Sequence, residues 1–321
     1  MTQTSVTDQL KSMLQIAIEV EHATLPPYLT ACWSIHGNSM YAQKARNLIL
    51  SVIREEMLHM AMACNILNAI GGRPNVNGKN FIPQYPAFLP GHSHTVNACR
   101  IHLLPCNKKA IKTFLQIEMP EQFTGNTQHE SGWSSIGEFY RTIIHLIGDP
   151  VLKEADFQYG KQVGNEANPA GGKLLTVSSR KEAIEAINEI LDQGEGHDLA
   201  AHYDKDNELT HYWKFREINA WMESGEWDFS NEVYPLDIEN GDAYFNAEAK
   251  ALNQQFNSLY SQMLDQLDTA FGSGTSMDAA ITTMLQLNPL AAQLVKIPLT
   301  GQPGNCGPAF EYIETARRKL L

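Results

Sequence analysis

Residues 54–74 read REEMLHMAMACNILNAIGGRP, and the fold of the chain can be worked out from this stretch. Its apolar residues recur at spacings of three and four, which is typical of one face of a helix. They continue a stripe that begins upstream, and the whole set is Ala45, Leu48, Ile49, Val52, Met60, Ala63, Ile66, Leu67 and Ile70. The residues Gly71-Gly72-Arg73-Pro74 then form a strong stop signal. Glu56 and His59 lie on the same stripe, three residues apart, so the helix should carry an ionisable pair toward the core.

A second long helix is expected immediately before this one. Apolar residues recur at helical spacing from Leu10 to Tyr28, Thr7 is a candidate N-cap, and the first break comes at His36-Gly37-Asn38. So short a connection predicts an antiparallel helical hairpin. Glu21 continues the apolar stripe of this helix, whereas Glu19 lies on its polar side. We therefore expect Glu21 to point inward.

The remainder of the chain predicts an all-α protein. Residues 74–132 are rich in Asn, Gly, Pro and His, which indicates a long irregular crossover with one short helix at about 108–118. Helical periodicity returns at 136–147, 179–195 and 206–222, and again at 243–271 and 277–296. We expect residues 1–225 to form a four-helix bundle and residues 226–321 to form a helical extension packed on it.

The composition excludes several classes of partner and location. A net charge of -12 with no Lys/Arg run argues against binding to nucleic acid or to a membrane surface. No secretory signal and no apolar run long enough to cross a bilayer are seen. The five cysteines are odd in number and show no C-x-x-C spacing, which argues against a disulfide framework or a zinc knuckle. We expect a protein of the reducing cytoplasm.

The pairing of Glu with His points to metal binding. Burying the ionised Glu56 without a partner would cost roughly several kcal/mol, which a bound cation would offset. A second Glu-x-x-His, Glu208 and His211, shares a face with Phe215, Ile218 and Met222. One such pair is usually an exposed surface pair, but two on apolar faces, with an additional inward Glu21, match the pattern of ferritin-like di-iron bundles. The alternative is a set of buried polar pairs that satisfy one another.

Periodicity alone does not decide which carboxylate the remaining helix of the bundle contributes to the metal site. Glu195 follows Ile184, Ile187 and Leu191 at near-helical spacing and could point inward from a helix end. Glu138 shares its stripe with polar neighbours, so periodicity does not favour it. Pro26 and Pro27 lie one turn beyond Glu21, where they would either open the helix beside a metal or merely bend it around packed neighbours.

Two stretches resemble a known family. AIEVEHATLPPYLTACWSI at 17–35 and the quoted 54–74 resemble the ferritin-like family typified by the iminophenyl-pyruvate dimer synthases of violacein and rebeccamycin biosynthesis. Further matches are FLQIEMPE, IGEFYRTI, ILDQGEGH, ELTHYWKFREI and GPAFEY. The resemblance implies metal ligands at Glu21, Glu56, His59, Glu138, Glu195 and His211, with Glu208 adjacent. The violacein enzyme is much longer, so its reaction does not transfer with the fold.

The function we expect is therefore an oxidoreductase. A pair of metal ions would use dioxygen or peroxide to oxidise a small, amino-acid-derived substrate. We expect iron, although manganese or a mixed pair accepts the same ligands. The alternatives are a metal storage or sequestration protein and a partner subunit of a biosynthetic complex. The length beyond the bundle would obstruct cage packing and favours the enzyme, and the two additional helices could support a homodimer.

Overall fold

Two long antiparallel helices form the centre of the molecule. The computed structural model describes residues 5–91, 100–120, 133, 135–164, 173–195 and 202–318. Helix α1 covers Val6–Ser34 and α2 covers Met40–Ala69, which confirms the predicted hairpin. Ser5, and not Thr7, is the N-cap of α1, because its hydroxyl accepts from the backbone N–H of Asp8 and also donates to the Asp8 carboxylate.

Helix α1 continues through Pro26 and Pro27. Pro27 has no N–H to donate to the carbonyl of Ala23, which lies four residues earlier. The hydroxyl of Tyr85, from the segment after α2, donates to that carbonyl at 2.7 Å. A side chain from elsewhere in the fold thus replaces the hydrogen bond that the proline removes.

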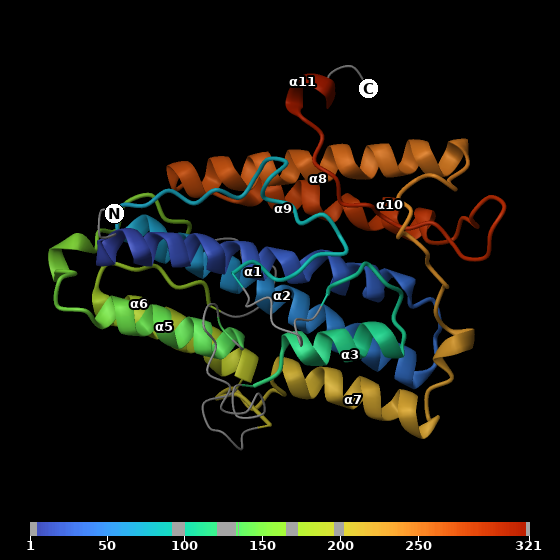
Figure 1. The fold of residues 1–321 in the computed structure, drawn as a ribbon, viewed down its shortest axis with the longest axis horizontal. Helices are drawn as coiled ribbons and strands as arrows, with labels where there is room; N and C mark the ends of the chain where they lie inside the picture. The colour runs from blue at the N-terminus through green and yellow to red at the C-terminus, as the bar shows by residue number, and fades with distance from the viewer. Residues whose placement is uncertain are drawn as a thin grey trace.

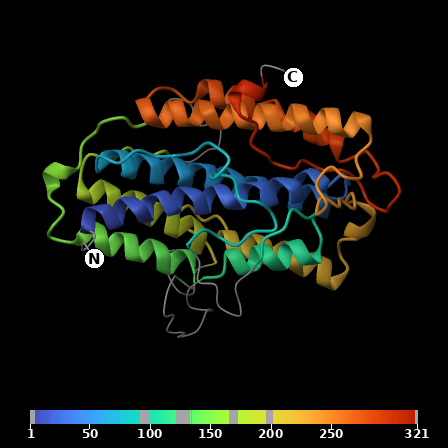
Figure 2. The same cartoon turned by 45° about the horizontal axis from the view of Figure 1, so that its top comes forward.

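The third and fourth helices of the bundle are each divided into two pieces. The third consists of α3 (Lys108–Ile117) and α5 (Ile136–Gly148), and the fourth of α6 (Arg180–Glu195) and α7 (His211–Ser224). Helix α5 packs on α6, and α3 packs on α7 (Figure 1, Figure 2). The short helix expected within the crossover is therefore present as α3, and it takes a place in the bundle.

Helix α7 begins five residues later than the predicted start at residue 206. The cause is Asp204, whose carboxylate oxygen accepts from the backbone N–H groups of Asp206 and Glu208. Asn207 then adopts a left-handed backbone conformation with φ 63°. This turn holds residues 204–208 outside any helix, so the helix can begin only after Thr210.

The C-terminal helices form a layer over the α1–α2 pair, on the side away from α5, α6 and α7 (Figure 1). The layer consists of α8 (Ala247–Ser273), α9 (Asp278–Leu285) and α10 (Leu287–Leu294). One helix was expected over 277–296. The break at Gln286 has a cause in Pro289, whose ring would clash with the carbonyl of Leu285 in a continuous helix.

One hydrophobic core extends from Leu10 on α1 to Phe310 beyond α10, so it crosses the predicted domain boundary near residue 225. The division into two units stays a prediction. The remaining elements are the turns Glu154–Asp156 and Phe229–Asn231 and the short helix α11 (Thr315–Arg318). Among the residues described, β-structure is limited to isolated bridges, and the all-α prediction is confirmed. No helix in this part of the chain combines the length and apolarity that crossing a bilayer requires.

Candidate metal centre

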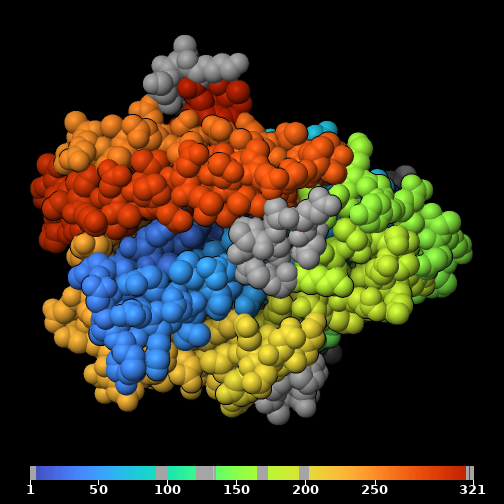
Figure 3. Space-filling view, turned by 180° about the vertical axis from the view of Figure 1, so that it is seen from behind, coloured from blue at the N-terminus to red at the C-terminus, as the bar shows by residue number. Residues whose placement is uncertain are grey.

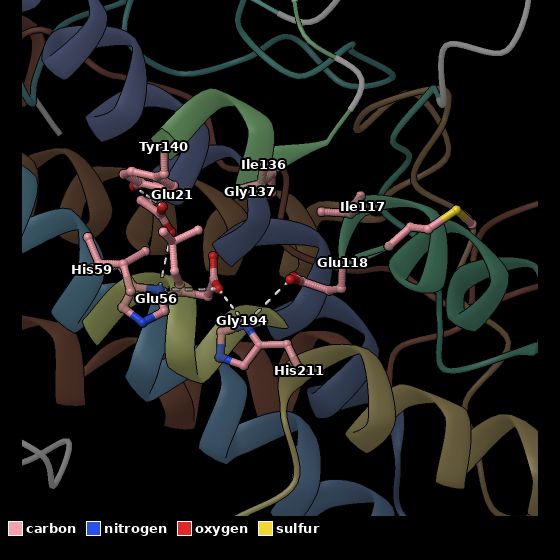
Figure 4. Close-up of a pocket in the computed structure, with 13 residues that line it drawn as sticks. Glu21, Glu56, His59, Ile117, Glu118, Ile136, Gly137, Tyr140, Gly194 and His211 are labelled. Carbon is pink, nitrogen blue, oxygen red and sulfur yellow. Dashed lines mark hydrogen bonds and ion pairs between the residues drawn. The ribbon is translucent and has the colours of Figure 1, made fainter. Parts of the chain in front are cut away.

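Five buried ionisable side chains meet where the third and fourth helices are interrupted (Figure 4). They come from α1, from α2, from the end of α3 and from the start of α7, and none is more than 7% exposed. The five are Glu21, Glu56, His59, Glu118 and His211.

These side chains form two groups that share Glu56. Glu21, Glu56 and His59 place one potential ligand atom each within 4.8 Å of one another, and so do Glu56, Glu118 and His211. The Nδ1 atom of His59 lies 3.6 Å from Glu21 and 3.8 Å from Glu56. The Nδ1 atom of His211 lies 2.9 Å from Glu56 and 3.4 Å from Glu118. A carboxylate common to two such groups has the position of a bridging ligand.

Both imidazoles are oriented by an acceptor on the far side of the ring. His211 Nε2 lies 2.8 Å from the Glu55 carboxylate, which also accepts twice from Lys214 Nζ at 2.7 Å. His59 Nε2 lies 2.8 Å from the side-chain oxygen of Gln193. Acceptors at both Nε2 atoms fix a proton there, so that in the neutral rings the Nδ1 lone pairs are directed toward the carboxylates. The buried Nδ1 of His211 has no hydrogen bond of acceptable geometry, despite its short contact with Glu56.

Each of the three carboxylates is held by a hydroxyl group at one oxygen. Tyr140 donates to Oε1 of Glu21 and Tyr28 donates to Oε1 of Glu118. Thr24 donates to Oε2 of Glu56 at 2.7 Å. The other oxygen of each carboxylate is the one that faces an imidazole Nδ1. One oxygen per carboxylate is thus committed to the protein, and the other is turned toward the centre.

Burial shifts the protonation of this cluster strongly. It raises the pKa of Glu21 to about 7 despite the hydrogen bond from Tyr140. Burial and the charge of Glu21 also raise the pKa of Glu56, whereas burial lowers the pKa of His59. Burial alone would lower the pKa of His211, but its carboxylate neighbours hold it well above the usual value. Without a metal, protons must supply part of the positive charge that these carboxylates need.

The donor set fits a pair of divalent metal ions. Three carboxylates and two Nδ1 atoms are oxygen and nitrogen ligands of the kind that iron and manganese accept. A histidine that binds a metal typically has its other ring nitrogen hydrogen-bonded, as both Nε2 atoms are here. The Nδ1 of His211, which has no hydrogen-bond partner, is then the atom free to bind the metal. Among the described side chains, the set has one carboxylate fewer than the four-Glu, two-His arrangement of di-iron bundles.

The structure brings together Glu21, Glu56, His59 and His211 from the residues expected as ligands. It does not bring Glu208 to them, because Glu208 is exposed in the turn before α7. Glu138 lies half-buried in the first turn of α5, outside both groups. Glu195 is the last residue of α6, and its side chain lies outside the described part of the structure.

Glu118 was missed by the sequence reasoning. It is the C-cap residue of α3 and is 7% exposed. A signal for it was present, because Glu118 follows Ile111 and Phe114 at spacings of three and four, so it shares the buried stripe of its helix. The irregular composition of the surrounding residues 74–132 masks this signal.

Comparisons with known proteins agree with this fold. A crystal structure of a ferritin-like protein from Caulobacter vibrioides matches with a TM-score of 0.71 over 98% of this chain and 100% of that one, at 20% identity. Dichlorochromopyrrolate synthase of Lentzea aerocolonigenes is 25% identical over 84% of this chain. The 2-imino-3-(indol-3-yl)propanoate dimerase of Chromobacterium violaceum is 23% identical over 90% of it. The chain spans only 30% and 32% of the lengths of these two enzymes.

The family assignment rests on a match to most of the bundle. The sequence profile of the ferritin-like family matches residues 14–220, which include all five clustered side chains. The resemblance to the enzymes of violacein and rebeccamycin biosynthesis is confirmed at low identity. By sequence and by fold, this chain belongs to the ferritin-like family.

Proposed function

We propose that the protein is an oxidoreductase that holds two metal ions, iron by preference, and uses dioxygen or peroxide to oxidise a small organic molecule. The observation that carries this proposal is the sharing of Glu56 by two carboxylate–histidine groups. Glu21 and His59 would complete one metal site, and Glu118 and His211 the other. When bound, the metal pair supplies the electrons and the Lewis acidity of the reaction.

The small size of the cavity at the centre supports separate places for the oxidant and the organic substrate. It has a volume of about 20 Å³, which is room for about one water-sized molecule. This space is too small for an organic substrate beside the carboxylates. The cavity also borders Ile117, Met119, Ile136 and Leu191, at the ends of the interrupted helices. The organic substrate would rest against this apolar rim.

The substrate class is proposed from the relatives. One of them is named for the dimerisation of an indole-bearing imino acid and the other for the synthesis of dichlorochromopyrrolate. An amino-acid-derived imine with an aromatic side chain is therefore the first substrate to try. Because the chain spans about a third of those enzymes, their complete reactions are not assumed for it.

Two further readings make different predictions. A storage or sequestration protein would bind metal but consume no dioxygen in response to a substrate. A partner subunit of a biosynthetic complex would need no reactive metal at all. The well-formed contacts at both Nε2 atoms support a resident metal pair rather than passing cargo.

The test combines elemental analysis with oxygen consumption. The purified protein should contain about two iron ions per chain after anaerobic reconstitution, and its spectrum should change when dioxygen is admitted. Oxygen uptake should then accelerate on addition of an aromatic imino acid. Bound iron without substrate-dependent uptake would favour storage, and the absence of stoichiometric metal would favour the partner-subunit reading.

The compartment and the oligomeric state remain part of the proposal. The four described cysteines, Cys32, Cys64, Cys106 and Cys306, are buried free thiols, which supports a reducing cytoplasm. Burial raises the pKa of the Cys32 thiol to about 12, so this thiol is not poised to react. A homodimer through the C-terminal layer is proposed and can be tested by analytical ultracentrifugation.

A further inference from the structure

A second, larger cavity lies on the opposite side of the α1–α2 pair from the metal centre. Its volume is about 280 Å³, and it is enclosed by α1, α2 and the C-terminal helices α8, α9 and α10. Figure 3 shows the face on which α2, in blue, borders the orange and red C-terminal layer. On α1 the cavity is lined by His22 and Leu25, while the neighbouring Glu21 faces the metal centre. The two cavities are therefore separate sites, and we call the larger one the slot.

The slot is elongated along the helices. Its lining extends from His22 to Trp33 on α1, from Leu50 to Ala61 on α2, and from Tyr260 to Phe271 on α8. Each run covers eleven residue steps, which in an α-helix correspond to roughly 16 Å. A long, narrow space of this kind suits an extended chain better than a compact ring system.

The walls of the slot are apolar and adaptable. Leucine and isoleucine side chains dominate, and five methionines contribute: Met57, Met60, Met263, Met277 and Met284. Methionine has an unbranched, flexible side chain that adjusts to ligands of different length. No carboxylate is among the described residues that line the slot.

Among the described residues, Arg54 is the only charged one that lines the slot. It is exposed, and it makes no hydrogen bond or ion pair with any other residue that the structure describes. Two other polar lining side chains make hydrogen bonds: His22 Nε2 pairs with Tyr260 at 2.6 Å, and Asn288 accepts from Trp33 at 3.0 Å. The buried Nδ1 of His22 has no partner among the described residues, but it carries no charge that would pair with an anion. An unpaired arginine at an apolar slot, in a chain of net charge -12, is a specific feature that calls for an anion.

The slot opens to solvent beside this arginine. Met57 on α2 is half-buried, and Leu285 on α9 is 58% exposed although both line the slot. A ligand can therefore enter between α2 and α9 and leave its head group at the surface.

We propose that the slot binds a straight-chain carboxylate, the free anion of a fatty acid of about eight to twelve carbons, with its carboxylate on Arg54 and its alkyl chain along the apolar walls. The guanidinium can hold both carboxylate oxygens in a bidentate pair. The proposal concerns a different site from the metal centre and holds whether or not the protein is an oxidoreductase.

Calorimetric titration of the full-length protein with octanoate, decanoate and dodecanoate tests the slot. Saturable binding of one molecule per chain is expected, with the affinity rising about fourfold for each added methylene until the chain outgrows the slot. Decanol should bind at least about tenfold more weakly than decanoate, because it lacks the charge that pairs with Arg54. Decyltrimethylammonium should show no saturable binding.

Variants separate the head-group contact from general stickiness. Arg54→Gln should weaken decanoate binding about tenfold and leave decanol binding unchanged. Arg216→Gln, at an exposed arginine on α7, removes the same charge elsewhere and should have no effect. Ala280→Leu, which fills part of the slot, should weaken the binding of dodecanoate more than that of octanoate. Circular dichroism and metal content should match the parent protein in all three.

Two results would overturn the proposal. The first is the absence of saturable binding by any of the three acids. The second is equal affinity for decanoate, decanol and decyltrimethylammonium with no response to Arg54→Gln, which would mean that apolar molecules adhere without recognition of a carboxylate.

Discussion

Replacing Glu21 with glutamine should stabilise the metal-free protein at alkaline pH while weakening its metal binding. Glu21 is 2% exposed, and burial raises its pKa to about 7. Above that pH the metal-free protein must bury an ionised carboxylate beside Glu56, whose pKa is raised for the same reasons. Glutamine has nearly the same shape, can still accept from Tyr140, and carries no charge.

The size and the sign follow from the shift in pKa. In the unfolded chain Glu21 titrates near 4.5, and in the folded chain near 7. Below about 4.5 the carboxyl is protonated in both states, so its contribution to stability is fully present. That contribution is lost as the pH rises through 7, and the complete loss is about 3 kcal/mol. The neutral glutamine avoids this loss. The free energy of unfolding of the variant should therefore exceed that of the parent by up to about 3 kcal/mol at pH 8 and match it near pH 4.5.

Urea unfolding with a chelator present, at pH 4.5 and at pH 8, measures the difference. A parallel titration with Fe(II) or Mn(II) under argon should show weaker binding by the variant. Glu208→Gln is the matched control, because Glu208 is exposed and should change neither quantity. If Glu21→Gln lowered the stability equally at both pH values, Glu21 would be acting as a hydrogen-bond acceptor in the core, and the electrostatic reasoning would be wrong.

Three further predictions address the remaining contacts. Glu118→Gln should reduce the metal content from about two ions per chain to about one, whereas Glu56→Gln should remove both, because only Glu56 is shared; equal losses in elemental analysis would contradict this arrangement. Glu55→Gln should weaken metal binding about ten- to hundredfold, measured by metal-competition titration. It should also lower the free energy of unfolding by about 3–5 kcal/mol, because Lys214 stays buried without a charged partner. Adding Lys214→Met should restore the thermal stability but not the metal affinity. Tyr85→Phe should lower the free energy of unfolding by about 1 kcal/mol, because the Ala23 carbonyl loses its donor, without changing the metal content.

Most of the helices could be predicted from the sequence because their apolar residues repeat with the helical period. The α1–α2 hairpin and α5, α6 and α8 lie close to the expected ranges. The errors fall where one side chain overrides the period. Asp204 caps a turn and delays α7, and Pro289 divides the last predicted helix at Gln286. Each effect comes from a single side chain, whereas helical periodicity is judged over many residues and does not register it.

The candidate ligands could be predicted where a carboxylate or an imidazole lies on an apolar stripe. Glu21, Glu56 and His59 satisfy this condition on long helices. Glu118 also satisfies it, but on a helix of only 10 residues inside a region that otherwise predicts irregular structure. Sequence spacing could not identify Glu55 and Gln193, the partners of the imidazoles, because each lies on a different helix from its histidine.

The third and fourth helices are both interrupted at the level of the buried cluster. At the level of the cluster, α3 and α6 end while α5 and α7 begin, so Ile117, Ile136 and Gly194 border the small cavity. Continuous helices would cover this level with side chains at every turn. The opposite flank is closed by α1 and α2, which carry the C-terminal layer on their outer side. Of the described helices, it is those that end or begin at this level that present Glu118, from α3, and His211, from α7, so we expect a molecule to approach the cluster between the helix ends.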